Sequence, residues 1–363
     1  MHELDERSVK AVARGLSRWF ETNARDLPWR RTRDPYAIWV SEIMLQQTRV
    51  ETVENYWGRF LERFPDVASL AAADEDAVLN QWSGLGYYRR ARLLHRGARH
   101  VHAQLGGALP ETAARLREIP GVGPYTAGAI ASIAFDQPAP LVDGNVARVH
   151  SRLAAIEEPA AQDAKAKHHW TFVERVLGHG RPRVLAQALM ELGATVCTPR
   201  SPSCASCPVR RQCRAHASGR SELIPAAKVK KKSPEIQLDG LALRFGRRIL
   251  IERRPNEGLL AGLWCLPLFE LGAGDLAARR EALAAAASEA IGVAISLDEQ
   301  PKPAVKHVFS HRVWHVLPWS GRARRAVKIK ARADGRSFAW LEADSEPEGG
   351  VPTLTRKLLR ASS

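Results

Sequence analysis

Residues 112–146 carry the feature that most constrains how this chain folds, a glycine-containing turn between two predicted helices. The pattern predicts a short helix over 112–119 and a tight turn over 120–123. Pro124 is suited to the first position of a second helix, which runs to about Phe135. The chain is therefore expected to contain two helices joined by a glycine-rich hairpin.

The two glycines of the turn, Gly121 and Gly123, permit positive φ angles and close approach of another backbone. Amides of the turn and of the following helix then point toward one anion, for which a DNA phosphate is the natural candidate. The alternative is an ordinary tight helical hairpin inside a core, and the glycines alone favour that interpretation.

A lone carboxylate, Asp143, follows apolar residues and precedes a further helix predicted over 146–153. The N-terminus of that helix would keep the carboxylate ionised through its dipole and its free amides. The order of hairpin, helix and aspartate resembles the helix-hairpin-helix superfamily of DNA glycosylases. The resemblance implies a hairpin that grips the DNA backbone and an aspartate that takes part in the chemistry.

The chain has 363 residues, enough for two domains, and its formal net charge of +15 favours a polyanionic partner. Nucleic acid ranks ahead of an anionic membrane because no basic amphipathic helix with a broad apolar face stands out. A merely basic surface is the alternative.

The first residues are acidic and polar, and no apolar run approaches the length of a membrane span. The expected location is the cytoplasm, in association with the nucleoid.

Glu42 lies within a predicted helix that Asp34 caps, that starts at Pro35 and that continues to Arg49. It shares one stripe of that helix with apolar residues. Burial there would disfavour the charged carboxylate and raise its pKa, which suits a general acid. The alternative is a partly exposed glutamate that pairs with Arg49 or another base, and the periodicity does not choose between the two.

Two segments place aromatic residues next to arginines. Trp29 offers a stacking face and Arg30 a phosphate or base contact, whereas the alternative is a surface turn with solvated charge. Tyr87 and Tyr88 precede a second arginine cluster, and one of them suits insertion into a stack of DNA bases. Packing of both tyrosines in a core is the alternative.

Four of the five cysteines fall between positions 197 and 213, which indicates a metal site rather than disulfides in a long chain without a signal sequence. Four thiolates suit tetrahedral zinc or a four-iron cluster, and ligand chemistry alone does not choose. The spacing resembles the iron-sulfur loop of the endonuclease III and MutY family, which implies one structural [4Fe-4S] cluster. Its ligands would be Cys197, Cys204, Cys207 and Cys213. The fifth cysteine, Cys265, is expected to be a small buried hydrophobe.

The predicted fold is an all-α helix-hairpin-helix core with an iron-sulfur cluster loop, followed by a C-terminal α/β domain. The core covers 1–217 and contains the hairpin (112–135) and the cysteine loop (197–213); a linker covers 218–235 and includes a lysine run at 228–232; the α/β domain covers 236–363. Within the last domain the pattern predicts an alternating strand over 236–245, a partner strand over 248–253, a helix over 275–291, and strands within 304–318 and 337–341.

A neutral Glu42 and an ionised Asp143 would form the pair of carboxyl groups that cleavage of a glycosidic bond requires. Relatives that also cleave the DNA strand attack the sugar with a lysine amine. This chain has no lysine between Lys10 and Lys165, and Tyr125 occupies the position where an endonuclease III-type lyase has its lysine. A monofunctional glycosylase is therefore expected.

The sequence around these residues resembles adenine DNA glycosylases of the MutY type, most strongly over 25–215. The resemblance implies that Glu42 protonates a flipped adenine, that Asp143 stabilises the cationic intermediate, and that Tyr125 and Asn145 support the site. It also implies a set of DNA contacts: Trp29, Arg30 and Glu191 at the base pocket, Gln47 and Tyr87 in the base stack beside an opposing 8-oxoguanine, and Gly121 and Gly123 at the backbone.

The C-terminal part is similar to the Nudix-like, MutT-related domain that such proteins use to read 8-oxoguanine. Phe309, Ser310 and His311 resemble its lesion-contacting turn. A Nudix hydrolase also needs several acids for its metal, but two of the expected positions hold Ala286 and Ala290. Lesion reading is therefore expected rather than phosphohydrolysis.

Taken together, the sequence predicts a monomer that removes adenine mispaired with 8-oxoguanine or guanine from double-stranded DNA in base excision repair. One alternative is an endonuclease III-like lyase that acts on oxidised pyrimidines. A second alternative is a non-catalytic DNA-binding sensor built on the metal cluster.

Overall fold

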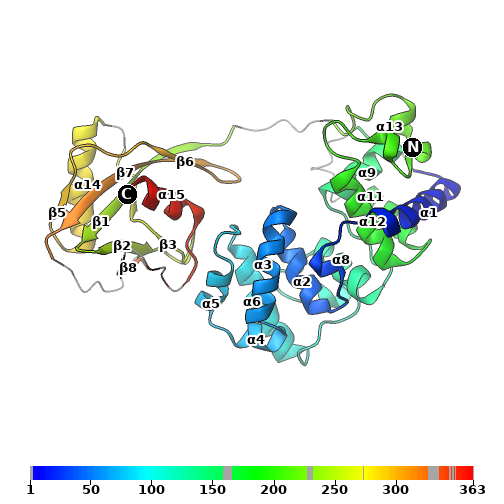
Figure 1. Ribbon diagram of the computed structural model, residues 1–363, viewed down its shortest axis with the longest axis horizontal. Helices are drawn as coiled ribbons and strands as arrows, with labels where there is room; N and C mark the ends of the chain where they lie inside the picture. Colours follow the sequence, from blue (N-terminus) through cyan, green and yellow to red (C-terminus); the bar gives the residue numbers. More distant parts are fainter. Residues whose placement is uncertain are drawn as a thin grey trace. The chain divides into compact units, whose positions relative to one another are not determined.

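The computed structural model describes residues 3–157, 166–226, 232–272, 274–325, 335–342, 345, 347 and 349–362. They fall into two compact units (Figure 1). The helical unit comprises Met1–Ala73 and Arg90–Lys230, and the sheet unit comprises Asp74–Arg89 and Lys231–Ser363. Apart from Lys232, the predicted lysine run lies outside the described residues.

The helical unit is built from α-helices joined by turns and short 3-10 segments. In chain order these are α1 (Glu6–Asn23), η1 (Pro28–Arg30), α2 (Pro35–Leu45), α3 (Val50–Arg63), α4 (Val67–Ala72), α6 (Arg89–Gln104), α7 (Ala113–Leu116), α8 (Pro124–Phe135), α9 (Gly144–Ala154), α11 (Lys167–Leu177), α12 (Pro182–Thr195), η2 (Cys204–Ser206), η3 (Arg210–Gln212) and α13 (Arg214–Ala217). Apolar residues of α1, α9, α11 and α12 form one buried cluster at the centre of this unit. Among the described residues no helix is both long enough and apolar enough to cross a membrane.

The predicted hairpin is present as α7 and α8. The Thr112 hydroxyl accepts a hydrogen bond from the Arg115 amide and starts α7, and Pro124 is the first residue of α8. Gly121 has a φ of 86° in the turn, so the expectation of a positive φ is confirmed there. Gly123 does not use the positive φ that glycine permits: its φ is −86°, because it is the extended residue that precedes the helix.

Helix α2 ends at Leu45, four residues earlier than predicted. Gln46 is extended and Gln47 has a φ of 60°, so neither continues the helix. The Arg90 guanidinium takes the place of the missing turn: its Nη1 donates to the carbonyl oxygens of Ile43, Met44 and Gln46. These bonds satisfy carbonyl groups that a helix C-terminus leaves without partners.

The sheet unit contains a mixed eight-stranded sheet and helices. Its elements are α5 (Glu75–Gln81), β1 (Glu235–Phe245), β2 (Arg248–Arg253), β3 (Trp264–Cys265), β4 (Leu268–Phe269), α14 (Leu276–Ile291), β5 (Ile295–Leu297), β6 (Val305–Val308), β7 (Val313–Ala323), β8 (Ser337–Glu342) and α15 (Thr353–Ala361). The strand order is β3-β2-β1-β7-β5, with β4 on β1, β6 on β7 and β8 on β2, and β1 pairs parallel with β7 (Figure 1).

The predicted alternation of buried and exposed residues in β1 is wrong, because Leu238 to Leu243 are all buried. Leu241 and Leu243 pack in one cluster with residues of α14, whereas Leu238 and Ala242 pack in another with residues of α15. Both faces of this strand are therefore covered, and a strand covered on both faces reads as a continuous apolar run. Cys265 is buried, as predicted.

Residues 74–89 are tied to the sheet unit by polar contacts. Asp76 pairs with Arg253 of β2 at 2.6 Å. The Tyr88 hydroxyl donates to the carbonyl oxygen of Val351 at 2.8 Å, and Tyr88 is buried, whereas Tyr87 is 48% exposed with a φ of 49°. Of the two neighbouring tyrosines, one packs in a core and one faces outward.

Close packing in α8 generates a stability prediction. A Cβ atom on Gly128 would lie 2.0 Å from the carbonyl oxygen of Pro140, which is backbone that cannot move aside cheaply. Gly128→Ala should therefore lower the free energy of unfolding by about 1–3 kcal/mol, measured as a lower thermal midpoint. The matched control is Gly58→Ala on α3, where a Cβ meets nothing within 4 Å. The control should be neutral or gain up to about 1 kcal/mol, and equal stability of the two variants would contradict the prediction.

Candidate active site

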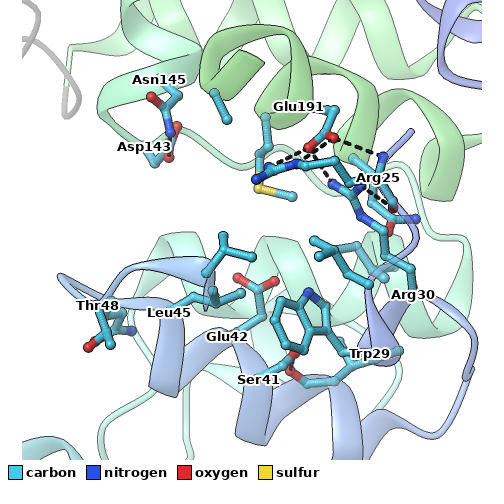
Figure 2. A pocket seen from close by; sticks show the side chains of 18 of the residues that line it. Arg25, Trp29, Arg30, Ser41, Glu42, Leu45, Thr48, Asp143, Asn145 and Glu191 are labelled. Carbon is cyan, nitrogen blue, oxygen red and sulfur yellow. Dashed lines mark hydrogen bonds and ion pairs between the residues drawn. The ribbon is translucent and has the colours of Figure 1, made fainter. Parts of the chain in front are cut away.

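A cavity of about 320 Å³ lies in the helical unit and is lined by residues from its widely separated segments. They are Arg25, Leu27, Trp29, Arg30, Ile38, Ser41, Glu42, Leu45, Gln46, Gln47, Thr48, Val50, Tyr125, Ile133, Asp143, Asn145, Gln187, Met190, Glu191 and Ala194. Figure 2 shows Glu42 reaching into this cavity from one side, with Asp143 and Glu191 on the other side. The volume lies in the range of small-molecule sites in proteins.

Glu42 is buried on α2, with 5% of its surface exposed. Tyr125, at the start of α8, donates a hydrogen bond from its hydroxyl to Oε2 of Glu42 at 2.9 Å. Burial raises the pKa of Glu42 to about 7; the Tyr125 hydrogen bond works against burial, and the nearby Asp143 adds to it. The structure thus supports the buried, readily protonated glutamate and not the partly exposed one.

Asp143 is the N-cap of α9. Its Oδ1 accepts from the Val146 amide at 2.7 Å, and its Oδ2 accepts from the Asn145 side-chain amide at 3.1 Å. Burial raises the pKa of Asp143, although these hydrogen bonds and the Arg148 charge lower it. The helix N-terminus therefore opposes burial of this carboxylate but does not outweigh it, which differs from the expectation drawn from the sequence.

Gly193 determines how closely α12 approaches α9. A Cβ at this position would lie 2.6 Å from the Cβ of Asn145. Arg148 joins the two helices, because its Nη2 donates to Asn145 Oδ1 at 2.9 Å and to the Gly193 carbonyl oxygen at 2.8 Å. The close approach brings Glu191 of α12 and Asp143 into one cavity.

Glu191 is 1% exposed and accepts hydrogen bonds from two arginines. Arg25 donates from Nε at 2.8 Å and from Nη2 at 2.7 Å, and Arg30 donates from Nη2 at 2.8 Å (Figure 2). Burial raises the pKa of Glu191, but the hydrogen bonds from Arg25 and Arg30 outweigh it and hold the pKa at about 2. Glu191 is thus ionised at neutral pH while Glu42 holds its proton readily.

Most of the residues predicted for the site lie together. Glu42, Tyr125, Asp143, Asn145, Trp29, Arg30, Gln47 and Glu191 all line the cavity. Trp29 is buried and the Arg30 side chain is 15% exposed, so the alternative of a solvated surface turn is wrong. Gly121 and Gly123 are exposed in the hairpin and do not line the cavity.

Tyr87 and the 309–311 turn belong to the sheet unit. Ser310 donates a hydrogen bond from its hydroxyl to the Tyr87 hydroxyl at 3.3 Å. Phe309 packs edge-on against Trp314, and Ser310 and His311 are exposed. The structure therefore brings two of the predicted lesion contacts, Tyr87 and Ser310, next to each other.

Sequence reasoning missed Arg25 and Met190. Arg25 binds Glu191 across 166 residues of sequence, and the Tyr125 hydroxyl lies 3.3 Å from the sulfur of Met190. No local sequence pattern predicts contacts between residues this far apart in the chain. For Met190, the one available signal was its position next to Glu191, which had been predicted to lie in the site.

The four clustered cysteines surround a second, small cavity of about 20 Å³. None of the four forms a disulfide, and Arg152 of α9 donates from Nη1 to the Cys197 sulfur at 3.3 Å. Four sulfur donors around one cavity, with a guanidinium beside them, fit a soft metal centre whose thiolates carry negative charge. The donor set therefore fits a metal cluster at these residues: Cys197, Cys204, Cys207 and Cys213.

Comparison with known proteins defines the class. Residues 40–174 match the family model of the HhH-GPD superfamily of base excision DNA repair proteins, and residues 240–361 match that of the NUDIX domain. The fold is similar to that of a thermostable thymine-DNA glycosylase, with a TM-score of 0.53 and 28% identity over 58% of this chain and 98% of that chain. The helical unit is thus a helix-hairpin-helix base excision repair fold, and a Nudix domain follows it.

Relatives of known name define the family within that class. The chain is 37% identical to the adenine DNA glycosylase of Mus musculus over 98% of this chain and 78% of the mouse protein. It is 40% identical to that of Rattus norvegicus over 72% of this chain and 61% of the rat protein, which is less than two thirds of the rat protein's length. The chain belongs to the adenine DNA glycosylase family, which confirms the resemblance predicted from its motifs.

The raised pKa of Glu42 predicts how stability depends on pH. The folded chain holds a proton that the unfolded chain releases, because the folded pKa is about 7 and the ordinary value is 4.5. Folding stability is therefore lost as pH rises from about 4.5 through about 7, by up to about 3 kcal/mol. Glu42→Gln, which stays neutral, should raise the thermal midpoint more at pH 8 than at pH 5. An equal change at the two pH values would show that the Glu42 pKa is ordinary.

Proposed function

We propose that this chain is a monofunctional DNA glycosylase that hydrolyses the N-glycosidic bond of adenine mispaired with 8-oxoguanine or guanine in double-stranded DNA. The observation that carries the proposal is Glu42, a buried carboxyl with a pKa of about 7, in the same cavity as Asp143. Relatives named adenine DNA glycosylases support the choice of base. The chain would act as a monomer in base excision repair, in association with the nucleoid.

Glu42 would act as the general acid. Tyr125 occupies Oε2 of this carboxyl with its own hydroxyl hydrogen, so a proton on Glu42 is available at Oε1. The flipped adenine is a poor leaving group as an anion, and protonation of a ring nitrogen makes it a better one. A glutamate with a pKa near the working pH transfers that proton most effectively, and such transfer contributes about 10²–10⁴-fold in rate.

Asp143 would face the sugar. Departure of the base leaves positive charge on the sugar ring, which a carboxylate stabilises before water completes the hydrolysis. Asn145 holds the Asp143 side chain at 3.1 Å, and Arg148 in turn holds Asn145 at 2.9 Å. This chain of hydrogen bonds would keep Asp143 in place while charge develops opposite it.

The wall of the cavity that contains Glu191 would select the base. Glu191 stays ionised and already accepts four hydrogen bonds from Arg25 and Arg30, so it fixes two guanidinium groups at this wall. Trp29 adds a buried aromatic ring, which packs edge-on against Trp57 with ring centroids 6.1 Å apart. A planar base whose ring nitrogens accept hydrogen bonds suits such a combination of guanidinium donors and aromatic surface.

Three exposed features would grip the DNA. The first turn of α8 follows Gly121 and Gly123 and has no side-chain cap, so its amides suit a phosphate. Gln47, exposed at the rim of the cavity, and Tyr87, exposed in the sheet unit, would enter the base stack. The hydrogen bond between Tyr87 and Ser310 supports a shared role with Phe309 and His311 in reading the opposing 8-oxoguanine.

We propose that the cysteine loop holds one [4Fe-4S] cluster through Cys197, Cys204, Cys207 and Cys213. When bound, the cluster supplies a rigid crosslink among these four positions. Arg152 contributes independently of the cluster, since it donates to the carbonyl oxygens of Thr198, Pro199 and Ile224 as well as to the Cys197 sulfur. The loop is thereby held on α9, the helix that Asp143 caps.

The direct test is single-turnover base release from a duplex with one adenine opposite 8-oxoguanine. Strand breaks should appear only after alkali, and borohydride should trap no covalent complex, because no lysine amine is proposed to attack the sugar. Glu42→Gln should lower the rate at least about 100-fold, and Asp143→Asn should do so as well, since Asn retains the cap of α9 but loses the charge.

The matched control for Glu42→Gln is Glu62→Gln, an exposed glutamate on α3 that should leave the rate unchanged. Strand breaks without alkali would support the endonuclease III-like lyase. Tight binding of the duplex without adenine release would support the non-catalytic sensor.

Tyr125 generates a second prediction, on the pH profile. Its hydrogen bond lowers the pKa of Glu42, so removing the hydroxyl should raise that pKa further. The rate should fall as pH rises through about 7 in the parent, because Glu42 then loses its proton. In Tyr125→Phe the same decline should occur at higher pH. An unchanged or lower midpoint would show that Tyr125 does not act on Glu42 through this hydrogen bond.

A further inference from the structure

Three histidines converge in the helical unit, and none of them lines the base cavity. His150 lies on α9, and His168 and His169 lie in the first turn of α11. The Nδ1 atoms of His150 and His169 are 2.8 Å apart, and the Nε2 atoms of His168 and His169 are 3.2 Å apart. One ring nitrogen from each histidine lies within 4.8 Å of those of the other two.

The burial of these rings requires an explanation. His150 and His169 are 3% and 0% exposed, and His150 stacks on Phe172 with ring centroids 4.1 Å apart. Polar rings in such surroundings need partners for their nitrogens. Here Nδ1 of His169 faces the His150 ring, and Nε2 of His169 faces the His168 ring. The nitrogens of all three rings therefore lie within a small volume.

One cation, Arg175, acts electrostatically on the cluster. A neutral imidazole is the form that binds a metal ion. The Arg175 charge, which would repel a cation, is paired with Glu6 at 2.6 Å, and Glu6 also lies 2.5 Å from His179.

We propose that His150, His168 and His169 form a binding site for a divalent transition-metal ion of the Zn²⁺ class, with one imidazole nitrogen from each residue as ligand. Zinc–nitrogen bonds of about 2.0–2.1 Å place tetrahedral ligands about 3.3 Å apart, so ring shifts of about an ångström complete the site. His168 is partly exposed, which gives the ion a path and leaves a fourth position to water. The ion joins α9 to α11.

The test uses the full-length chain, free of any histidine tag, with its cysteine loop loaded. After dialysis against Zn²⁺, metal analysis should find one zinc per chain beyond the iron of the loop, and zinc should raise the thermal midpoint. Co²⁺ in place of Zn²⁺ should give visible d–d absorption without the near-ultraviolet band of thiolate-to-metal charge transfer. The second result distinguishes histidine ligands from the cysteine loop and needs no variant.

His168→Gln should weaken zinc binding at least about tenfold and reduce the rise in thermal midpoint at the same zinc concentration. This residue is chosen because its partial exposure makes the substitution compatible with folding, which the unchanged midpoint without zinc would verify. The control is His102→Gln, an exposed histidine of α6 that should bind zinc like the parent. No zinc beyond the loop metal, equal binding by His168→Gln and the parent, or a thiolate band with Co²⁺ would overturn the proposal. None of these readouts depends on adenine release.

Discussion

Burial of the Glu42 carboxyl among α2, α8, α9 and α12 is the constraint on which the chemistry of the helical unit depends. An ionised carboxylate costs much more to bury than a neutral one, so the surroundings decide which carboxyl group keeps the proton. Glu42 receives one hydrogen bond, from Tyr125, whereas Asp143 receives two and lies at a helix N-terminus. Glu191 has the lowest pKa of the three, because hydrogen bonds from two arginines hold it ionised. Burial thus raises the pKa of both Glu42 and Asp143, whereas the hydrogen bonds from Arg25 and Arg30 hold the pKa of Glu191 low in the same cavity.

Local chemistry explains which parts of the site the sequence predicted. Pro124 at the start of α8 and Asp143 as an N-cap depend on neighbours within about one turn of helix, and both were predicted correctly. Contacts between distant segments were missed because no periodicity encodes them. The pair of Arg25 and Glu191 spans 166 residues, and Arg90 ends α2 from 46 residues away at Met44. Arg90 also explains why the predicted helix over 35–49 was too long.

In the sheet unit, too, features that depend on contacts between distant segments were not predicted from the sequence. The positions of β1 and β2 follow apolar runs, and the helix over 275–291 follows the Asp275 cap, both of which a sequence displays. The alternation predicted for β1 failed because it assumes one solvated face, and here α14 and α15 cover both. Likewise, nothing in residues 74–89 indicates that they are tied to β2 and to Val351, since the partners lie more than 170 residues away.

Helix α9 and its N-cap residue support four separate features. Asp143 caps its start, Arg148 reaches α12, and Arg152 holds the cysteine loop, while His150 points to α11. Each residue of an α-helix is rotated by about 100° from the one before it. A one-residue insertion or deletion inside α9 would therefore turn its two ends by that angle and separate the cavity from the loop. We therefore expect α9 to tolerate no insertion or deletion, even at positions where a side chain can be replaced.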